Sequence, residues 1–203
     1  MAKLLLFIIS LFSVSLNASS TENECKFLKF IDNLTVVNKE FETIKKVPNL
    51  EREFKSSGVV KFIKNKGFIW KEQSPRNIIF ISTKTRYCSK VITKDGTVEE
   101  KNALLKDLPY FSEISSLIDN ILLKDYEMLH RAFSVNYTEK KVPSSWALTL
   151  IPNANKMKKF ISQIKVVGDE KKIESINVNY ENGISITLKF YDAKVMLNDE
   201  IKC

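Results

Sequence analysis

The sequence predicts a mainly β (α+β) domain: an incomplete antiparallel β-barrel of about nine to eleven strands, with helices capping its concave face. Apolar and polar residues alternate with a period of two in most segments from residue 36 to residue 190, as in strands that bury one face. Turn-forming sets such as Asn182-Gly183 separate these segments and are typical of hairpins. Because strands twist regularly, a long sheet of this kind curls toward a barrel.

The first 18 residues predict a cleavable secretory signal peptide. A cationic start at Lys3 precedes the apolar run 4–12 and a small-residue stretch that ends at Ala18. This is the order found in signal peptides, and the apolar run is shorter than the roughly 20 residues of a membrane-spanning helix. We therefore expect residues 19–203 to form a single exported domain.

Strand patterns dominate the first half of the expected domain. A short amphipathic helix is predicted over 23–34, where apolar residues recur every three or four positions. The β-branched segment 36–47 then predicts a strand that ends at Pro48. Further strands, separated by turn-forming residues, are expected at 58–63, 68–70, 77–82 and 86–93.

Helical periodicity returns only in the middle of the chain. Apolar residues from Phe111 to Leu122 fall on one helical face and the spacing continues to Phe133, so two helices are expected here. Alternation then resumes, and the final hairpin is centred on Asn182-Gly183. The expected strands of this half are 133–137, 146–150, 161–167, 176–180 and 184–190. No linker or repeat divides the chain, so one domain is expected.

No pattern of catalytic or metal-binding residues stands out. His130, the only histidine, lies in a charged helical stretch and is expected at the surface. The chain has no nucleophile elbow, zinc-protease motif or glycine-rich phosphate loop. Cys25, Cys88 and Cys203 match no zinc spacing, and export would permit one disulfide whose pairing stays open. We therefore expect no enzymatic activity, no cofactor and no metal site.

The chain is basic, with a formal net charge of +8 that is carried almost wholly by lysine. A basic surface is compatible with anionic lipid headgroups or nucleic acid, and equally with solubility alone. Because the protein is expected to be exported, we expect no nucleic-acid partner.

An apolar sheet face of this size needs cover. If the helices fill the concave face, the sheet encloses an ordinary core. If they cap it as a lid, a cavity remains for a guest molecule. Periodicity leaves both alternatives open. Alternation nominates five residues for the lining of such a cavity: Phe62, Ile79, Ile81, Trp146 and Leu148.

Several short blocks occur in an order that is shared with a known family. They include Gly67-Phe68-Ile69-Trp70, then Trp146-Ala147-Leu148-Thr149-Leu150-Ile151-Pro152, with Phe41 before them and Gly168-Asp169 after. Over residues 36–192 the chain thereby resembles the LolA-like periplasmic outer-membrane lipoprotein carriers. The resemblance implies an incomplete barrel with a helical lid, whose cavity holds the acyl chains of a lipoprotein crossing the periplasm of a Gram-negative bacterium.

The resemblance also implies partners and site residues. Acylated lipoprotein or another lipid would pass from an inner-membrane export complex to an outer-membrane acceptor, and we expect the carrier to be a monomer. Phe41, Phe68 and Trp70 join the expected lipid-binding residues. Family carriers place an arginine before the Phe-x-Trp segment, whereas this turn holds Lys64, the lid-latch candidate, which lacks the planar guanidinium fork.

The cargo stays open, because the pattern looks closer to a LolA-like subgroup that exports other lipidic products. Two alternatives use the same residues differently. One is a periplasmic lipid-sensing or regulatory module on the same fold, and the other is an acyl hydrolase.

Overall fold

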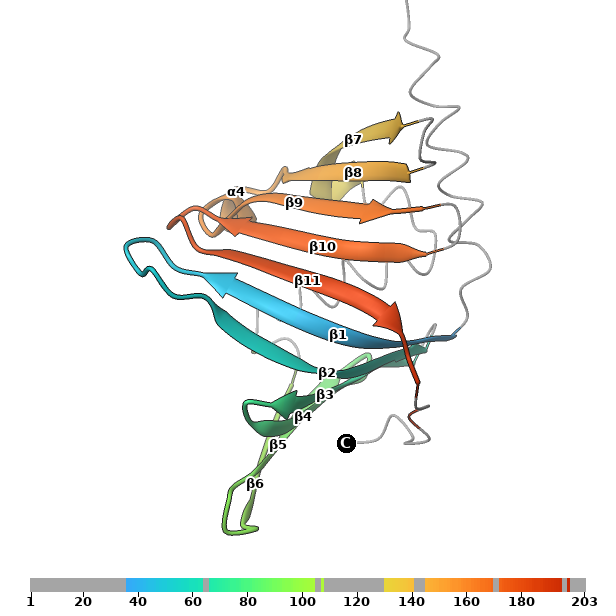
Figure 1. The fold of residues 1–203 in the computed structure, drawn as a ribbon. Coiled ribbons are helices and arrows are strands. Elements are labelled where there is room, and N and C mark those ends of the chain that lie inside the picture. Colours follow the sequence, from blue (N-terminus) through green and yellow to red (C-terminus); the bar gives the residue numbers. More distant parts are fainter. Residues whose placement is uncertain are drawn as a thin grey trace, which may run out of the picture.

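Figure 1 shows the fold in a computed structural model of the chain. The structure describes residues 36–63, 66–104, 107, 130–140, 145–169, 172–194 and 197. The predicted signal peptide, the helix expected over 23–34 and most of the helical region 111–133 lie outside these residues. Lys64, the lid-latch candidate, lies outside them too.

Eleven strands form one antiparallel sheet with the order β6-β5-β4-β3-β2-β1-β11-β10-β9-β8-β7. The strands are β1 (Val36–Lys46), β2 (Phe54–Ile63), β3 (Gly67–Ser74), β4 (Asn77–Ser82), β5 (Arg86–Ile92), β6 (Val98–Leu104), β7 (Phe133–Lys140), β8 (Ser145–Pro152), β9 (Ile161–Gly168), β10 (Ile173–Tyr180) and β11 (Ser185–Asp192). A short helix, α4 (Asn155–Lys158), lies between β8 and β9.

The sheet is strongly curved but is not closed (Figure 1). β1 pairs with β11, so the first and last strands lie side by side near its centre. β6 and β7 form the two edges and do not pair with each other in the described part of the chain. The predicted incomplete antiparallel barrel is therefore confirmed, while the predicted capping helices fall outside the described residues.

Two elements were not predicted, β6 and α4. Along β6 every residue but Ala103 is exposed, so the strand lacks the alternation that burial imposes on central strands. An edge strand with charged residues on both faces is a common protection against unwanted pairing. The helical spacing that was extended to Phe133 ends earlier, because Phe133 is the first residue of β7.

Glycine fixes two of the turns. Gly183 adopts a φ of 80° in the predicted Asn182-Gly183 turn, and its N–H donates to the Tyr180 carbonyl at 3.0 Å. Gly67 begins β3 with a φ of 124°, and a Cβ there would lie 1.9 Å from the Ser82 carbonyl oxygen. Only glycine fits this position, because it tolerates positive φ and has no Cβ.

Strand pairing sorts the side chains onto two faces, since directly paired residues point to the same side. One side, the apolar face, carries most of the large hydrophobic residues of all but the edge strand β6. Its hydrophobic members are Val135, Phe133, Tyr137, Trp146, Leu148, Leu150, Ile164, Val166, Ile176, Val178, Ile186, Leu188, Phe190, Phe41, Val60, Phe62, Phe68, Trp70, Phe80, Ile78, Tyr87 and Val91. The opposite face of β7 to β11 is polar, with residues such as Asn136, Thr149, Lys165, Asn177 and Lys189.

The apolar face holds two buried clusters. The β8–β9 core contains Trp146, Leu148, Leu150, Ile164 and Val166, with Met157 of α4 packed among them. The aromatic core contains Phe41, Val60, Phe62 and Phe68 from β1, β2 and β3.

A third cluster lies on the opposite face of β3 to β5. It consists of Ile69, Ile81 and Cys88, with Ile79 and Leu197 packed against it. Cys88 is disulfide-bonded, with a partner outside the described residues. The Nζ of Lys61 donates to the carbonyl of Leu197 at 2.6 Å, which helps to hold the end of the described chain against this face.

Candidate functional site

The candidate site is the part of the apolar face that lies between its two buried clusters. Four aliphatic and aromatic residues of β10 and β11 occupy this position, and each is only half-buried. We call them the central strip: Ile176, Ile186, Leu188 and Phe190. A contiguous apolar patch with buried walls on both sides is the kind of surface that apolar ligands use.

The aromatic core forms one wall of the strip. The rings of Phe41 and Trp70 lie with their centroids 3.8 Å apart, although they come from β1 and β3. Gly58, the β2 residue paired with Phe41, has no side chain, so the indole reaches Phe41 across β2. A Cβ at Gly58 would lie 1.9 Å from the Lys71 carbonyl oxygen, so no other residue fits. The glycine thus permits a packed aromatic wall.

Four of the predicted lipid-binding residues come together in this wall. Phe41, Phe62 and Phe68 are buried, and Phe62 and Phe68 pack with ring centroids 5.5 Å apart. Trp70 packs against the same cluster but stays half-buried. Of the four, Trp70 is therefore the residue with the most surface to offer a ligand.

Trp146 and Leu148 share the apolar face but belong to the β8–β9 core on the far side of the strip. The Nε1 of Trp146 donates to the Asp169 carbonyl at 2.5 Å. Gly168 makes room for the indole, because a Cβ there would lie 2.5 Å from Trp146 Cζ2. These contacts fix Trp146 as a packed core residue.

Ile79 and Ile81 are not brought together with the other predicted residues. Trp70 pairs with Phe80, so Phe80 shares its face and the two isoleucines beside Phe80 point to the other side. They pack instead in the third cluster, near Leu197. We therefore leave both out of the candidate site.

Sequence reasoning did not nominate the residues of the central strip as site residues. Alternation in β11 was visible, but nothing local shows that β11 pairs with β1. That pairing sets Phe190 opposite Phe41 and Leu188 opposite Thr43. The strip therefore depends on contacts between the two ends of the folded domain.

Two polar side chains of β1 lie on the apolar face beside the strip, Thr43 opposite Leu188 and Lys45 opposite Ile186. The Thr43 hydroxyl is buried and has no hydrogen-bond partner among the described residues. Tyr87 of β5 and Tyr180 of β10 are half-buried, and desolvation raises the pKa of both phenols. Both therefore remain neutral at neutral pH, so the surroundings of the strip gain no charge from them.

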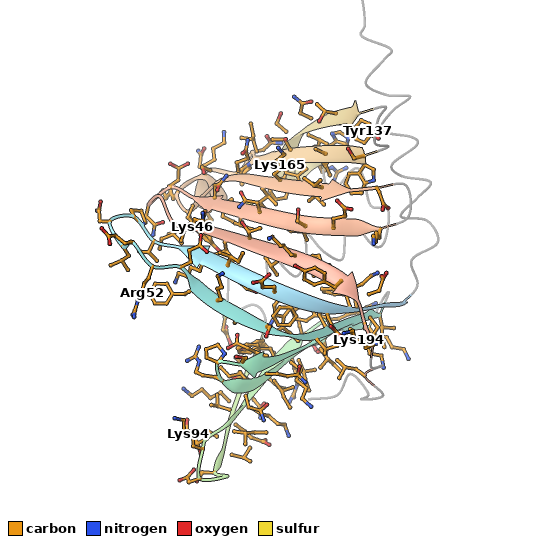
Figure 2. The ribbon with its side chains drawn as sticks, in the orientation of Figure 1. Lys46, Arg52, Lys94, Tyr137, Lys165 and Lys194 are labelled. Carbon is orange, nitrogen blue, oxygen red and sulfur yellow. The ribbon has the colours of Figure 1, made fainter. Side chains whose placement is uncertain are left out.

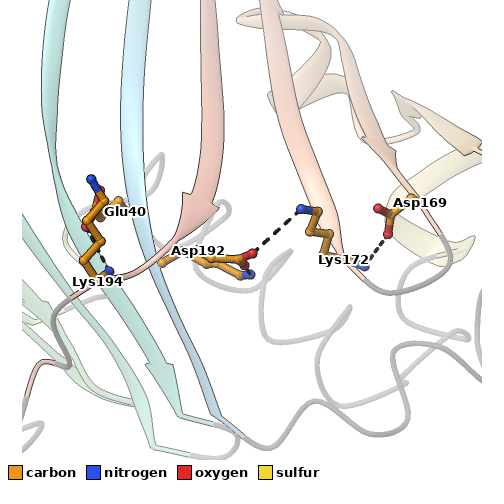
Figure 3. A network of polar contacts seen from close by, with 6 residues as sticks. Glu40, Asp169, Lys172, Asp192 and Lys194 are labelled. Atoms are coloured by element: carbon orange, nitrogen blue, oxygen red, sulfur yellow. Dashed lines mark hydrogen bonds and ion pairs between the residues drawn. The ribbon is translucent and has the colours of Figure 1, made fainter.

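A network of charged residues lies at the end of the strip where the Asp192–Lys39 pair follows the Phe190–Phe41 pair, and Figure 3 shows this network. Lys39 of β1 forms an ion pair with Asp192 of β11, and the Nζ of Lys172 lies 3.9 Å from the other Asp192 oxygen. The backbone N–H of Lys194 donates to the Glu40 carboxylate at 3.0 Å. The hydrogen bond and charge of Lys39, with the charge of Lys172, hold the pKa of Asp192 below its usual range.

Neither a group of metal ligands nor a membrane-spanning helix occurs among the described residues. No group of three His, Cys, Asp or Glu within them is placed to hold a metal ion. None of the helical segments among them has the length and apolar character to cross a membrane. His130 is exposed, and its backbone carbonyl accepts a hydrogen bond from the Asn153 side chain at 3.0 Å.

No protein-family model and no curated protein matches the chain. Solved structures do match it over most of its length. One is a putative outer membrane lipoprotein-sorting protein domain from Vibrio parahaemolyticus, at 12% identity and a TM-score of 0.42, covering 90% of this chain and 94% of that one. Another is a LolA superfamily protein from Nitrosomonas europaea, at 7% identity and a TM-score of 0.41, covering 85% and 91%.

This chain is similar to both structures in overall architecture. A DUF1329 family protein from Desulfovibrio piger also matches, at 8% identity and a TM-score of 0.44, covering 89% of this chain and 95% of that one. All three TM-scores are below 0.5, so the likeness concerns overall architecture and says nothing about cargo.

Proposed function

We propose that this protein is a lipid carrier that shields acyl chains against its apolar face. The single observation that supports this role is the half-buried central strip between two fully buried clusters. A domain that buried its apolar face only for stability would gain by burying the strip as well, because each Å² of apolar surface removed from water contributes roughly 25 cal/mol.

The energetics of cargo favour a surface of this extent. Each acyl methylene exposed to water costs about 0.8 kcal/mol, so a chain of about sixteen carbons represents on the order of 12 kcal/mol. The strip lies on β10 and β11, and beyond β1 and β2 the same face carries Trp70 of β3 and Phe80 of β4. A row of side chains across several strands suits a long, narrow ligand better than a compact one.

Thr43 supplies the polar contact of the proposed site. Its buried hydroxyl, unpaired within the described part of the chain, lies opposite Leu188 of the strip and Ser56 of β2. A hydroxyl in an apolar setting gains from any acceptor that reaches it. We propose that it donates to the ester or amide carbonyl that joins an acyl chain to its headgroup or protein.

The same proposal extends to where the carrier works. The signal-peptide pattern of residues 1–18 favours export, and the sequence resemblance favours a periplasmic route from an inner-membrane export complex to an outer-membrane acceptor. The cargo is then an acylated lipoprotein or a related lipid. No residue of the strip selects between these two cargoes.

Tryptophan fluorescence tests the site directly. The chain has two tryptophans, Trp70 beside the aromatic core and Trp146 within the β8–β9 core. A fatty acid brominated along its chain quenches an indole that it contacts. We expect the Trp146→Phe variant, which keeps Trp70, to be quenched on binding.

The matched control is Trp70→Phe, which keeps only the packed Trp146. We expect much weaker quenching of this variant at the same saturation, with saturation measured separately by a displaced fluorescent fatty acid. Thermal unfolding confirms that both variants are folded. Equal quenching of the two indoles, or no binding of fatty acid by the folded wild type, would contradict the proposal.

A further inference from the structure

Three connections of the sheet meet at one end of the molecule. They are the β1–β2 loop, the segment with α4 between β8 and β9, and the β10–β11 turn, and Figure 1 shows them at the same end. Gly183 lies against Pro48, since a Cβ on it would be 2.7 Å from Pro48 Cγ. The Glu181 N–H donates to the Phe160 carbonyl at 2.9 Å. We call residues 46–55, 154–160 and 181–183 the basic tip.

The basic tip exposes large apolar side chains. Leu50 in the β1–β2 loop is 52% exposed, Phe54 at the start of β2 is 38% exposed, and Phe160 after α4 is 41% exposed. The Arg52 guanidinium lies over the Phe54 ring, 4.9 Å from its centroid. Three exposed hydrophobic residues on loops that contact one another are more than the scattered apolar residues of an ordinary surface.

The same loops carry an excess of positive charge. The tip contains six basic residues and three acidic ones, a formal net charge of +3. Glu53 is engaged by Lys46 at 3.0 Å and by Lys55 at 3.9 Å. Four cations of the tip form no ion pair with any other described residue: Arg52, Lys156, Lys158 and Lys159.

At the opposite end of β1 and β11, charged side chains form ion pairs with one another. There Lys39, Lys172 and Asp192 satisfy one another, as Figure 3 shows. Figure 2 shows Lys46 and Arg52 at the tip and Lys194 at the opposite end. The tip therefore combines three exposed apolar side chains with four cations that form no ion pair among the described residues.

We propose that the basic tip docks onto an anionic lipid bilayer. Lysine and arginine would contact the headgroups, and Leu50, Phe54 and Phe160 would enter the interface between headgroups and acyl chains. This combination of basic and exposed apolar side chains is what binds peripheral proteins to anionic membranes. The charge complementarity favours this occupant over a neutral surface, and the inference goes beyond the proposed carrier role because it concerns a different part of the molecule.

Vesicle co-sedimentation of residues 19–203 tests the proposal. We expect binding to vesicles of phosphatidylcholine with phosphatidylglycerol, little binding to pure phosphatidylcholine, and weakening as salt is raised. Each lysine near an anionic surface contributes roughly fivefold to the affinity, so a triple loss is expected to weaken binding on the order of a hundredfold. The triple variant is Lys156→Gln, Lys158→Gln and Lys159→Gln.

The matched control removes the same charge from exposed positions away from the tip, and Figure 2 labels one of them, Lys94. The control variant is Lys84→Gln, Lys94→Gln and Lys101→Gln. We expect it to keep most of the binding. If the two triple variants lost the same vesicle affinity, binding would depend on net charge alone, and the proposed docking by the basic tip would be overturned.

A second pair of measurements separates the tip from the lipid site. Leu50→Ser is expected to weaken vesicle binding severalfold at any salt concentration, because it removes an apolar contact. The triple tip variant is expected to retain fatty-acid binding, which identifies it as folded. Membrane docking would be overturned if Leu50→Ser bound vesicles as tightly as the wild type, or if wild-type binding did not depend on phosphatidylglycerol. Neither result would bear on the carrier role.

Discussion

Replacing Leu188 by glutamine tests the central strip at its middle. Leu188 lies on the apolar face and is half-buried, whereas its neighbour Lys189 is exposed on the opposite face. Neighbouring strands are about 4.8 Å apart, so an acyl chain that crosses the strip passes about four methylenes over each strand. At about 0.8 kcal/mol per methylene, losing half of this contact costs about 1.6 kcal/mol, which is about fifteenfold in affinity.

The assay is titration of a fluorescent fatty acid into residues 19–203 carrying Leu188→Gln, with Lys189→Gln as the control on the same strand. The control is expected to bind within about twofold of the wild type, because its side chain does not face the strip. Urea unfolding of both variants separates lost affinity from lost stability.

The reasoning fails if Leu188→Gln is folded and binds fatty acid as tightly as the wild type. It also fails if Lys189→Gln loses as much affinity as Leu188→Gln. Either result would mean that the acyl chain does not bind across β11 and that the half-buried strip is ordinary surface.

Three further predictions concern packing, charge and the buried hydroxyl. Gly168→Ala sets a methyl group 2.4 Å from the Lys172 carbonyl oxygen and 2.5 Å from Trp146 Cζ2 and should lower the free energy of unfolding by about 1–3 kcal/mol; a smaller change in urea unfolding would show that the Lys172 backbone and the indole both shift freely. The pKa of Asp192 is lowered, chiefly by its hydrogen bond to Lys39. The ionised carboxylate therefore stabilises the folded state above the usual aspartate pKa of about 3.9, and this stabilisation is lost as the pH falls through the lowered pKa. Unfolding of Asp192→Asn should therefore depend less on pH below about pH 4 than unfolding of the wild type, and parallel pH profiles would contradict the ion pair. Thr43→Val removes a buried unpaired hydroxyl and should stabilise the empty protein by about 1 kcal/mol; calorimetry should also show weaker binding of acyl esters, and unchanged ester affinity would exclude the proposed hydrogen bond.

The sequence by itself determined most of the strands and their turns. The segment expected at 77–82 is β4 with the same bounds, and the hairpin centred on Asn182-Gly183 forms as predicted. These features are local, because alternation reports burial of one face and a turn is set by two or three residues. β6 was not predicted because alternation appears only where one face of a strand is buried, and nearly every residue of this edge strand is exposed.

The tertiary structure alone decided which residues share the site. Alternation shows that Ile79 and Ile81 lie on one side of β4, but only the pairing of Trp70 with Phe80 decides that this side faces away from the aromatic core. Likewise, the pairing of β1 with β11 brings Phe190 to Phe41. The physical reason is that periodicity is a property of neighbouring residues, whereas register is chosen by hydrogen bonds and packing between strands that are distant in the chain.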